Sequence, residues 1–156
     1  MAAFTVELDV HAPPDRVFAV FSDFRNLAKN IAGVQRAEVL TEGEIGAGTR
    51  FRETRIMFKK EATEEMEITE WDPPRSYVVE CDSCGAHYRS EFRFEPLPVS
   101  DGPGGTKVVL SFTCKPLTFA AKLMSPLGIV FACSIKKAML ADMEDLKKVA
   151  EEVVEG

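Results

Sequence analysis

Apolar and polar residues alternate along most of the chain between residues 34 and 114, in runs separated by glycine, proline and aspartate. Such alternation is typical of β-strands that have one buried face and one solvated face. The runs are joined by short turns such as Asp72-Pro73-Pro74-Arg75, so neighbouring strands should pair antiparallel. The middle of the chain therefore predicts an antiparallel sheet, and this restricts the possible folds more than any other feature.

The flanking segments complete the expected elements. The expected strands cover residues 4–10, 35–41, 49–59, 61–71, 76–82, 87–95 and 108–114, and a proline- and glycine-rich loop covers residues 98–106. Pro13-Pro14-Asp15 predicts the start of a helix, and Ser22-Asp23 offers a second cap, so two short helices are expected. Everything after Pro116 is expected to be helical, with a break or kink at Pro126 and Gly128.

We therefore expect an α+β fold. A bent antiparallel sheet of about seven strands would wrap around one long C-terminal helix, with the two short helices after the first strand. At 156 residues the chain should form a single domain spanning residues 1–156.

Composition excludes several classes of protein. The net charge of −6 argues against a dedicated nucleic-acid binder, which usually carries a basic field. The most apolar stretch, Leu123 to Ile135, is too short to span a bilayer, which needs about 20 apolar residues. Four irregularly spaced cysteines do not suggest a disulfide framework, and no signal peptide is apparent, so we expect a cytoplasmic location.

Four segments, in the same order along the chain, resemble the helix-grip superfamily of START lipid-transfer domains, birch-pollen-allergen-like proteins and polyketide cyclase/dehydrase-like proteins. Val10–Phe18 is similar to the superfamily's opening, in which a strand and Ala-Pro precede a helix. Ser22–Leu27 resembles the second helix, Gly46–Phe51 resembles the Gly-x-Gly-Thr start of the third strand, and Ile68–Arg75 resembles the turn with Pro-Pro-Arg. The resemblance covers essentially the whole chain and implies a helix-grip fold with an internal cavity.

The inward side of the expected sheet and helix gives a candidate ligand-binding set. Its members share the apolar parity of their strand or lie on the apolar side of the last helix, and a few polar groups among them could orient a ligand. The set is Phe51, Glu53, Arg55, Met57, Met66, Ile68, Tyr77, Val79, Tyr88, Ser90, Phe92, Phe94, Leu110, Phe112, Leu123, Leu127, Phe131, Ile135 and Met139. Periodicity alone favours a solid core of the same residues, and the resemblance favours a cavity.

In the expected third strand, residues 49–59, apolar and charged residues do not separate onto opposite faces. Phe51 and Met57 share one side with Glu53 and Arg55, so a bulge could switch the phase of this strand. An inward Glu53 or Arg55 would orient a ligand, whereas an outward pair would be an ion pair in solvent.

Other chemistry-bearing residues favour structural interpretations. Cys81 and Cys84 form a lone C-x-x-C without a second close pair, so neither a zinc site nor a redox site is indicated. His11 and His87 fall on the outward parity and are expected at the surface.

Two further patterns are also interpreted as structural. The glycines between Gly43 and Gly48 precede a strand rather than a helix, so they predict a turn and not a phosphate cradle. The glutamates between Glu61 and Glu70 are interpreted as a solvated sheet face rather than a cation site.

The leading functional hypothesis is binding or transport of a hydrophobic small molecule, such as a lipid, quinone or polyketide-like compound, with no cofactor, metal or catalytic residue. Tyr77, Tyr88 and Ser90 would orient the ligand, and the segments 43–48 and 125–128 would gate its access. The alternatives are a cyclase/dehydrase-type enzyme, for which Glu53, Arg55 and Tyr88 are the candidate acid–base groups, and a protein-interaction module.

Overall fold

The computed structural model describes residues 2–57, 59–83, 85–98, 104–118 and 125–152, and for Ala2, Met57 and residues 125–134 it describes the backbone. The elements follow one another in the order β1 Ala2–Val10, α1 Pro14–Phe21, the 3-10 helix η1 Phe24–Asn26, α2 Leu27–Asn30, β2 Val34–Val39, β3 Arg50–Met57, β4 Lys60–Asp72, β5 Ser76–Ser83, β6 Ala86–Leu97, β7 Gly105–Pro116 and α4 Ser125–Glu152.

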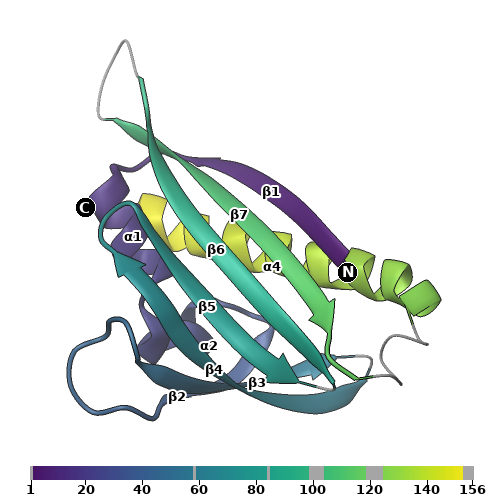
Figure 1. The fold of residues 1–156 in the computed structure, drawn as a ribbon. Coiled ribbons are helices and arrows are strands. Elements are labelled where there is room, and N and C mark those ends of the chain that lie inside the picture. The colour runs from purple at the N-terminus through teal and green to yellow at the C-terminus, as the bar shows by residue number, and fades with distance from the viewer. Residues whose placement is uncertain (1, 58, 84, 99–103, 119–124, 153–156) are drawn as a thin grey trace.

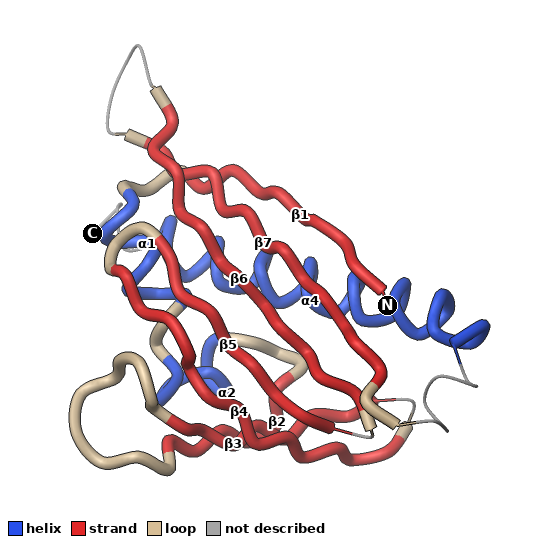
Figure 2. Tube along the Cα trace, in the orientation of Figure 1, coloured by secondary structure: helices blue, strands red, loops and turns tan. Residues whose placement is uncertain are grey.

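All seven strands belong to one antiparallel sheet in the order β1-β7-β6-β5-β4-β3-β2. The sheet curves, and α4 lies along its concave side together with α1 and α2, while the opposite side carries no helix among the described residues (Figures 1 and 2). This arrangement is a helix-grip fold, as the strand pattern and the resemblance predicted.

The N-terminal helices are short because of local sequence. Pro14 begins α1, where its missing N–H has no intrahelical partner to lose. The helix ends at Ser22, whose hydroxyl donates a hydrogen bond of 2.7 Å to the Phe18 carbonyl. Ser22 therefore closes α1 rather than capping the next helix as the sequence suggested, and the break between the two helices was predicted in the right place.

Three local expectations were wrong. No bulge interrupts the pairing of β3 with β4, and the irregularities lie instead in β2 near Val34 and in β4 near Ile68. Strand β7 extends through Pro116, and Leu117 and Thr118 are not helical. Pro126 lies in the first turn of α4, where proline is tolerated, and the helix continues from Ser125 through Gly128 without the expected break.

One half of the concave face is filled by aromatic rings from the N-terminal helices. Phe18 of α1 packs edge-on against Tyr77 and Phe94, with ring centroids 5.7 and 5.3 Å apart, and Phe24 stacks on Phe51 at 4.5 Å. These residues belong to the main buried cluster of the protein. Among the described helices, those near the N-terminus thus fill one end of the grip, and α4 covers the other end.

Candidate binding cavity

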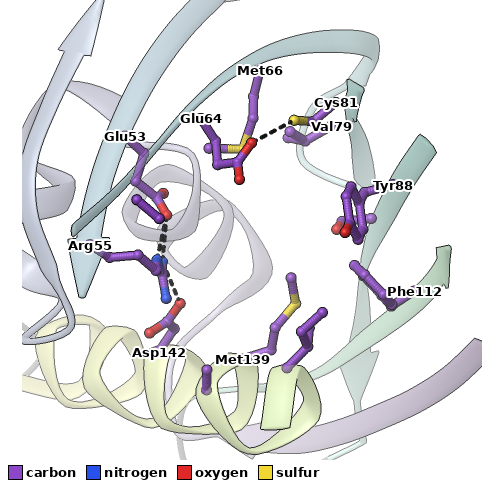
Figure 3. Close-up of a pocket in the computed structure, with 14 residues that line it drawn as sticks. Glu53, Arg55, Glu64, Met66, Val79, Cys81, Tyr88, Phe112, Met139 and Asp142 are labelled. Carbon is purple, nitrogen blue, oxygen red and sulfur yellow. Dashed lines mark hydrogen bonds and ion pairs between the residues drawn. The ribbon is translucent and has the colours of Figure 1, made fainter. Parts of the chain in front are cut away.

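A cavity of about 160 Å³, partly open to solvent, lies between the concave face of strands β3–β7 and the helix α4 (Figure 3). Side chains of alternate residues on each strand and of one side of the helix form its walls. The lining residues are Glu53, Arg55, Ala62, Glu64, Met66, Val79, Cys81, Tyr88, Ser90, Phe112, Ile135, Ala138, Met139 and Asp142.

Backbone periodicity explains why these side chains converge. Alternate residues of a strand point to the same face, so Glu53 and Arg55 of β3 share the concave side, and Tyr88 and Ser90 of β6 do the same. On α4 the lining residues follow the spacing i, i+3, i+4, i+7 from Ile135 to Asp142, which is one side of a helix. The cavity therefore follows directly from the register of the elements.

The walls differ in character around the cavity. Tyr88, Phe112 and Met139 form an apolar side, and Met66 and Val79 continue it across the sheet (Figure 3). The opposite side carries charged groups from β3, β4 and α4. An apolar body with a polar edge is the usual make-up of a small-molecule site.

Arg55 links the sheet to the helix at the polar side. Its guanidinium contacts Glu53 Oε1 through Nε at 2.7 Å and Nη2 at 2.6 Å, and Nη2 also donates to Asp142 Oδ2 at 3.0 Å. The three side chains are only 14–19% exposed. The orientation of Glu53 and Arg55, left open by the sequence, is thus inward, and the pair is not an ion pair in open solvent.

Burial and neighbouring charges shift the pKa values of Asp142 and Arg55. Desolvation raises the pKa of Asp142 to about 6, against the opposing attraction of Arg55, and Glu53 and Asp145 raise it further. Burial by itself would lower the pKa of Arg55, but Glu53 and Asp142 outweigh it and hold the pKa above its ordinary value. Asp142 is therefore a carboxyl that exchanges protons close to neutral pH.

A third carboxylate, that of Glu64, lies beside Glu53. Glu64 of β4 pairs directly with Glu53 of β3 in the sheet register, and its Oε2 accepts a hydrogen bond from Cys81 Sγ at 3.6 Å. Burial, followed by the charge of Glu64, raises the pKa of the Cys81 thiol to about 12. Cys81 is consequently a protonated donor and not a reactive thiolate at neutral pH.

The structure separates the residues expected to contact a ligand into two groups. Those that line the cavity are Glu53, Arg55, Met66, Val79, Tyr88, Ser90, Phe112, Ile135 and Met139. Those that do not line it are Phe51, Ile68, Tyr77, Phe92, Phe94 and Leu110, which all pack in or against the buried cluster. They share the inward parity, but they lie nearer the end of the sheet that the N-terminal helices cover.

Tyr77 shows the difference most clearly. Its hydroxyl donates a hydrogen bond of 3.0 Å to the Phe21 carbonyl, and its ring stacks on Phe92 with centroids 5.0 Å apart. Complete burial raises its pKa well above the usual range. The hydroxyl expected to orient a ligand thus holds α1 on the sheet.

Four residues of the expected set have no described side chain. Met57 ends β3, and Leu127 and Phe131 lie in the part of α4 that the structure describes by its backbone. Leu123 lies outside the described residues, as does Cys84 of the C-x-x-C pattern.

Sequence reasoning missed Ala62, Glu64, Cys81, Ala138 and Asp142. Glu64 was assigned to a solvated face, but it shares the parity of Met66 two residues later, and that parity was the available signal. Asp142 lies seven residues after Ile135 and three after Met139, so helical spacing placed it on the same side.

The glycine segment 43–48 is not at the cavity. Gly46 lies against the Trp71 ring, and Gly48 N–H donates to the Ile68 carbonyl at 2.7 Å, near the aromatic end of β4. Residues Ala62 to Met66, at the other end of β4, line the cavity. The segment is therefore a turn, as expected, and its residues do not line the cavity.

The two histidines do not line the cavity. His87 is on the convex face, where hydrogen bonds to Asp82 and to Glu80 raise its pKa. His11 is exposed.

In the described part of the chain, no group of three or more His, Cys, Asp or Glu residues could hold a metal ion. No helix in that part has the length and apolar character needed to cross a membrane.

Comparison with known proteins identifies the family. Residues 1–151 match the sequence profile of the family described as polyketide cyclase/dehydrase and lipid transport. The chain belongs to this family. No curated protein matches it.

Several solved structures have the same fold. The Zhui aromatase/cyclase from Streptomyces sp. R1128 is 18% identical, with a TM-score of 0.79 over 98% of this chain and 95% of that one. Protein TTHA0849 of Thermus thermophilus is 27% identical, with a TM-score of 0.66 over 97% and 95%. Ara h 8.0201 is 18% identical, with a TM-score of 0.65 over 96% and 97%.

Proposed function

We propose that this member of the polyketide cyclase/dehydrase and lipid transport family binds an apolar small molecule in the cavity between the sheet and α4. The observation that carries the proposal is the division of the concave face. Aromatic rings fill one end, whereas about 160 Å³ remains empty at the other between Met66, Phe112 and Met139. An apolar cavity of about 150 Å³ holds a benzene ring in another protein. This cavity is also partly open to solvent, so it suits one ring or chain segment of a larger apolar molecule.

Ligand contacts are proposed for the lining part of the expected set. Burial of the ligand against Met66, Val79, Phe112, Ile135 and Met139 would supply affinity at roughly 25 cal/mol per Å² of apolar area. Methionine side chains adapt to varied shapes, which suits a lipid-, quinone- or polyketide-like ligand. The family's association with lipid transport and cyclisation supports the same class of ligand.

A pair of variants on one helix tests the proposal. Ala138 lines the cavity, whereas Ala141, three residues later on α4, is exposed. Ala138→Trp should fill the cavity and reduce binding of the neutral dye Nile red at least tenfold, whereas Ala141→Trp should leave binding unchanged. Dye fluorescence and native mass spectrometry of the gently purified protein provide the measurements. Equal dye binding by both variants would contradict the proposal.

A second candidate is a cyclase/dehydrase-type enzyme that uses the same cavity. Asp142, with its pKa raised by burial to about 6, has the proton affinity of a general acid or base near neutral pH. The Zhui aromatase/cyclase shares the fold. If this candidate is correct, the protein should accelerate cyclisation of a poly-β-keto thioester surrogate, and Asp142→Asn should abolish the acceleration without abolishing dye binding. An unchanged rate in the presence of the wild-type protein would leave binding as the function.

A further inference from the structure

The charges around the cavity are unbalanced. Among the described residues that line it, Glu53, Glu64 and Asp142 carry a carboxylate and Arg55 carries a guanidinium. Arg55 already lies between Glu53 and Asp142, within 3.0 Å of each. Its positive charge is therefore compensated by the protein itself. The described part of the lining carries excess negative charge once its carboxyls are ionised.

The excess charge is concentrated where β3 and β4 pair. Glu53 and Glu64 are directly opposite each other on the concave face, and like charges in this position destabilise a sheet. The convex face of the same ladder is different, because Arg50 pairs with Glu67 and Arg52 with Glu65. Arg50 there lies 3.3 Å from Glu65 and 3.6 Å from Glu67. Opposite charges thus pair on the outside, and two carboxylates face each other at the cavity.

Glu64 has the weaker compensation of the two carboxylates. It accepts a hydrogen bond from the Cys81 thiol at 3.6 Å, and thiols are weak donors. The Glu64 carboxylate points into the cavity in Figure 3, opposite the apolar side formed by Phe112 and Met139. A ligand whose ring lies against that apolar side would place its polar end near this carboxylate.

We propose that the cavity selects apolar ligands that carry a hydrogen-bond donor, a hydroxyl or an ammonium group, directed at Glu64 and Glu53, and that it excludes ligands with a free carboxylate. This inference rests on the proposed function and names the class of ligand for the same site. A hydrogen bond from such a donor to a carboxylate is stronger than one from a thiol, and a cation would relieve the repulsion between the two glutamates. An anionic end would instead face three carboxylates whose one cationic partner is already engaged.

The raised pKa values of Cys81 and Asp142 agree with excess negative charge around the cavity. The charges of Glu64 and Glu53 are among the causes that raise the pKa of Cys81, after burial. The charge of Glu53 also helps to raise the pKa of Asp142, again after burial. Both groups retain their protons more strongly because of the carboxylates around them. The same carboxylates would attract a hydrogen-bond donor or a cation of a bound ligand.

Three ligands with one ring system and different polar ends test the inference. Binding of 2-naphthol, 2-naphthylmethylamine and 2-naphthoate to the wild-type protein is measured by isothermal titration calorimetry at pH 7.5. The alcohol and the amine should bind at least tenfold more tightly than the carboxylate. Naphthoate binding as tightly as naphthol would overturn the inference but leave the proposed function intact. Binding of none of the three would overturn both.

Two glutamates on one strand provide the matched variants. Glu64→Gln should weaken binding of 2-naphthylmethylamine about tenfold and strengthen binding of 2-naphthoate. Glu65→Gln, one residue later and on the convex face, removes the same charge outside the cavity and should change neither affinity. Equal effects of the two variants would overturn the inference. If Glu64→Gln does not fold, Glu53→Gln carries the same expectation, because its amide oxygen can still accept from Arg55.

Discussion

Arg55 of β3 and Asp142 of α4 are joined by a hydrogen bond of 3.0 Å between residues 87 positions apart in the chain. The same guanidinium holds Glu53, so one side chain connects a sheet strand to the gripping helix and forms a wall of the cavity. The aromatic cluster fixes the other end of the grip by packing. Two different kinds of interaction thus set the distance between sheet and helix.

Replacing Arg55 tests this link. Arg55→Met should lower the free energy of unfolding by about 3 kcal/mol, because it leaves two largely buried carboxylates without their cation. Arg36→Met is the control, since the Arg36–Glu61 pair is 72% and 52% exposed and should contribute at most about 1 kcal/mol. Urea unfolding monitored by circular dichroism measures both. Similar losses in the two variants would show that the link to α4 has no special weight.

Asp142 should make stability depend on pH in the direction opposite to an ordinary salt-bridged aspartate. Its pKa in the folded protein, about 6, lies above the value of 3.8 for an unperturbed aspartate, so the folded state binds the proton more tightly. The stability that protonated Asp142 contributes is fully present below the unperturbed pKa, and it is lost as the pH rises through the pKa of the folded state. The groups that act on it are Arg55, Glu53 and Asp145.

The measurement is the free energy of unfolding of the wild-type protein minus that of Asp142→Asn, followed from about pH 4 to about pH 7.5. The difference should fall by about 2–3 kcal/mol across this range as the pH increases. A difference that is constant, or that rises with pH, would show that burial does not dominate the environment of Asp142.

Tyr77 and Tyr88 should have separable roles. Tyr77→Phe removes the donor to the Phe21 carbonyl and should cost about 1–2 kcal/mol of stability, with Nile red affinity changed less than twofold. Tyr88→Phe removes the hydroxyl of a side chain that lines the cavity and should affect dye affinity more than stability. Thermal unfolding and dye titration of both variants provide the test. Loss of dye binding in Tyr77→Phe, with unchanged stability, would reverse the assignment.

The sequence predicted the fold well because its strongest signals are local. Alternation in strands such as Phe4–Val10 and spacing in the C-terminal helix depend on neighbouring residues alone, and the connecting turns impose antiparallel pairing. The expectation of a bulge in β3 was wrong because it, too, rested on a local signal. Mixed parity in one strand does not reveal that Glu53 and Arg55 are held inward by Asp142, which lies far away in the sequence.

The candidate site was predicted in part. Parity identified the inward face, so Met66, Val79 and Phe112 were placed correctly beside the cavity. Parity does not reveal which end of that face another element covers, and for this reason Tyr77 and Phe94 were grouped with them. Glu64 and Asp142 were missed because a carboxylate is interpreted as solvated unless its partner is known, and their partners come from other elements.

The central claim is that the unfilled end of the grip is a binding site. The most direct measurement is a crystal structure of the protein with 2-naphthol. The account predicts the ring between Met66, Phe112 and Met139, with its hydroxyl within hydrogen-bond distance of Glu64 or Glu53. A cavity closed by its own side chains, with the ligand absent or bound elsewhere, would contradict it.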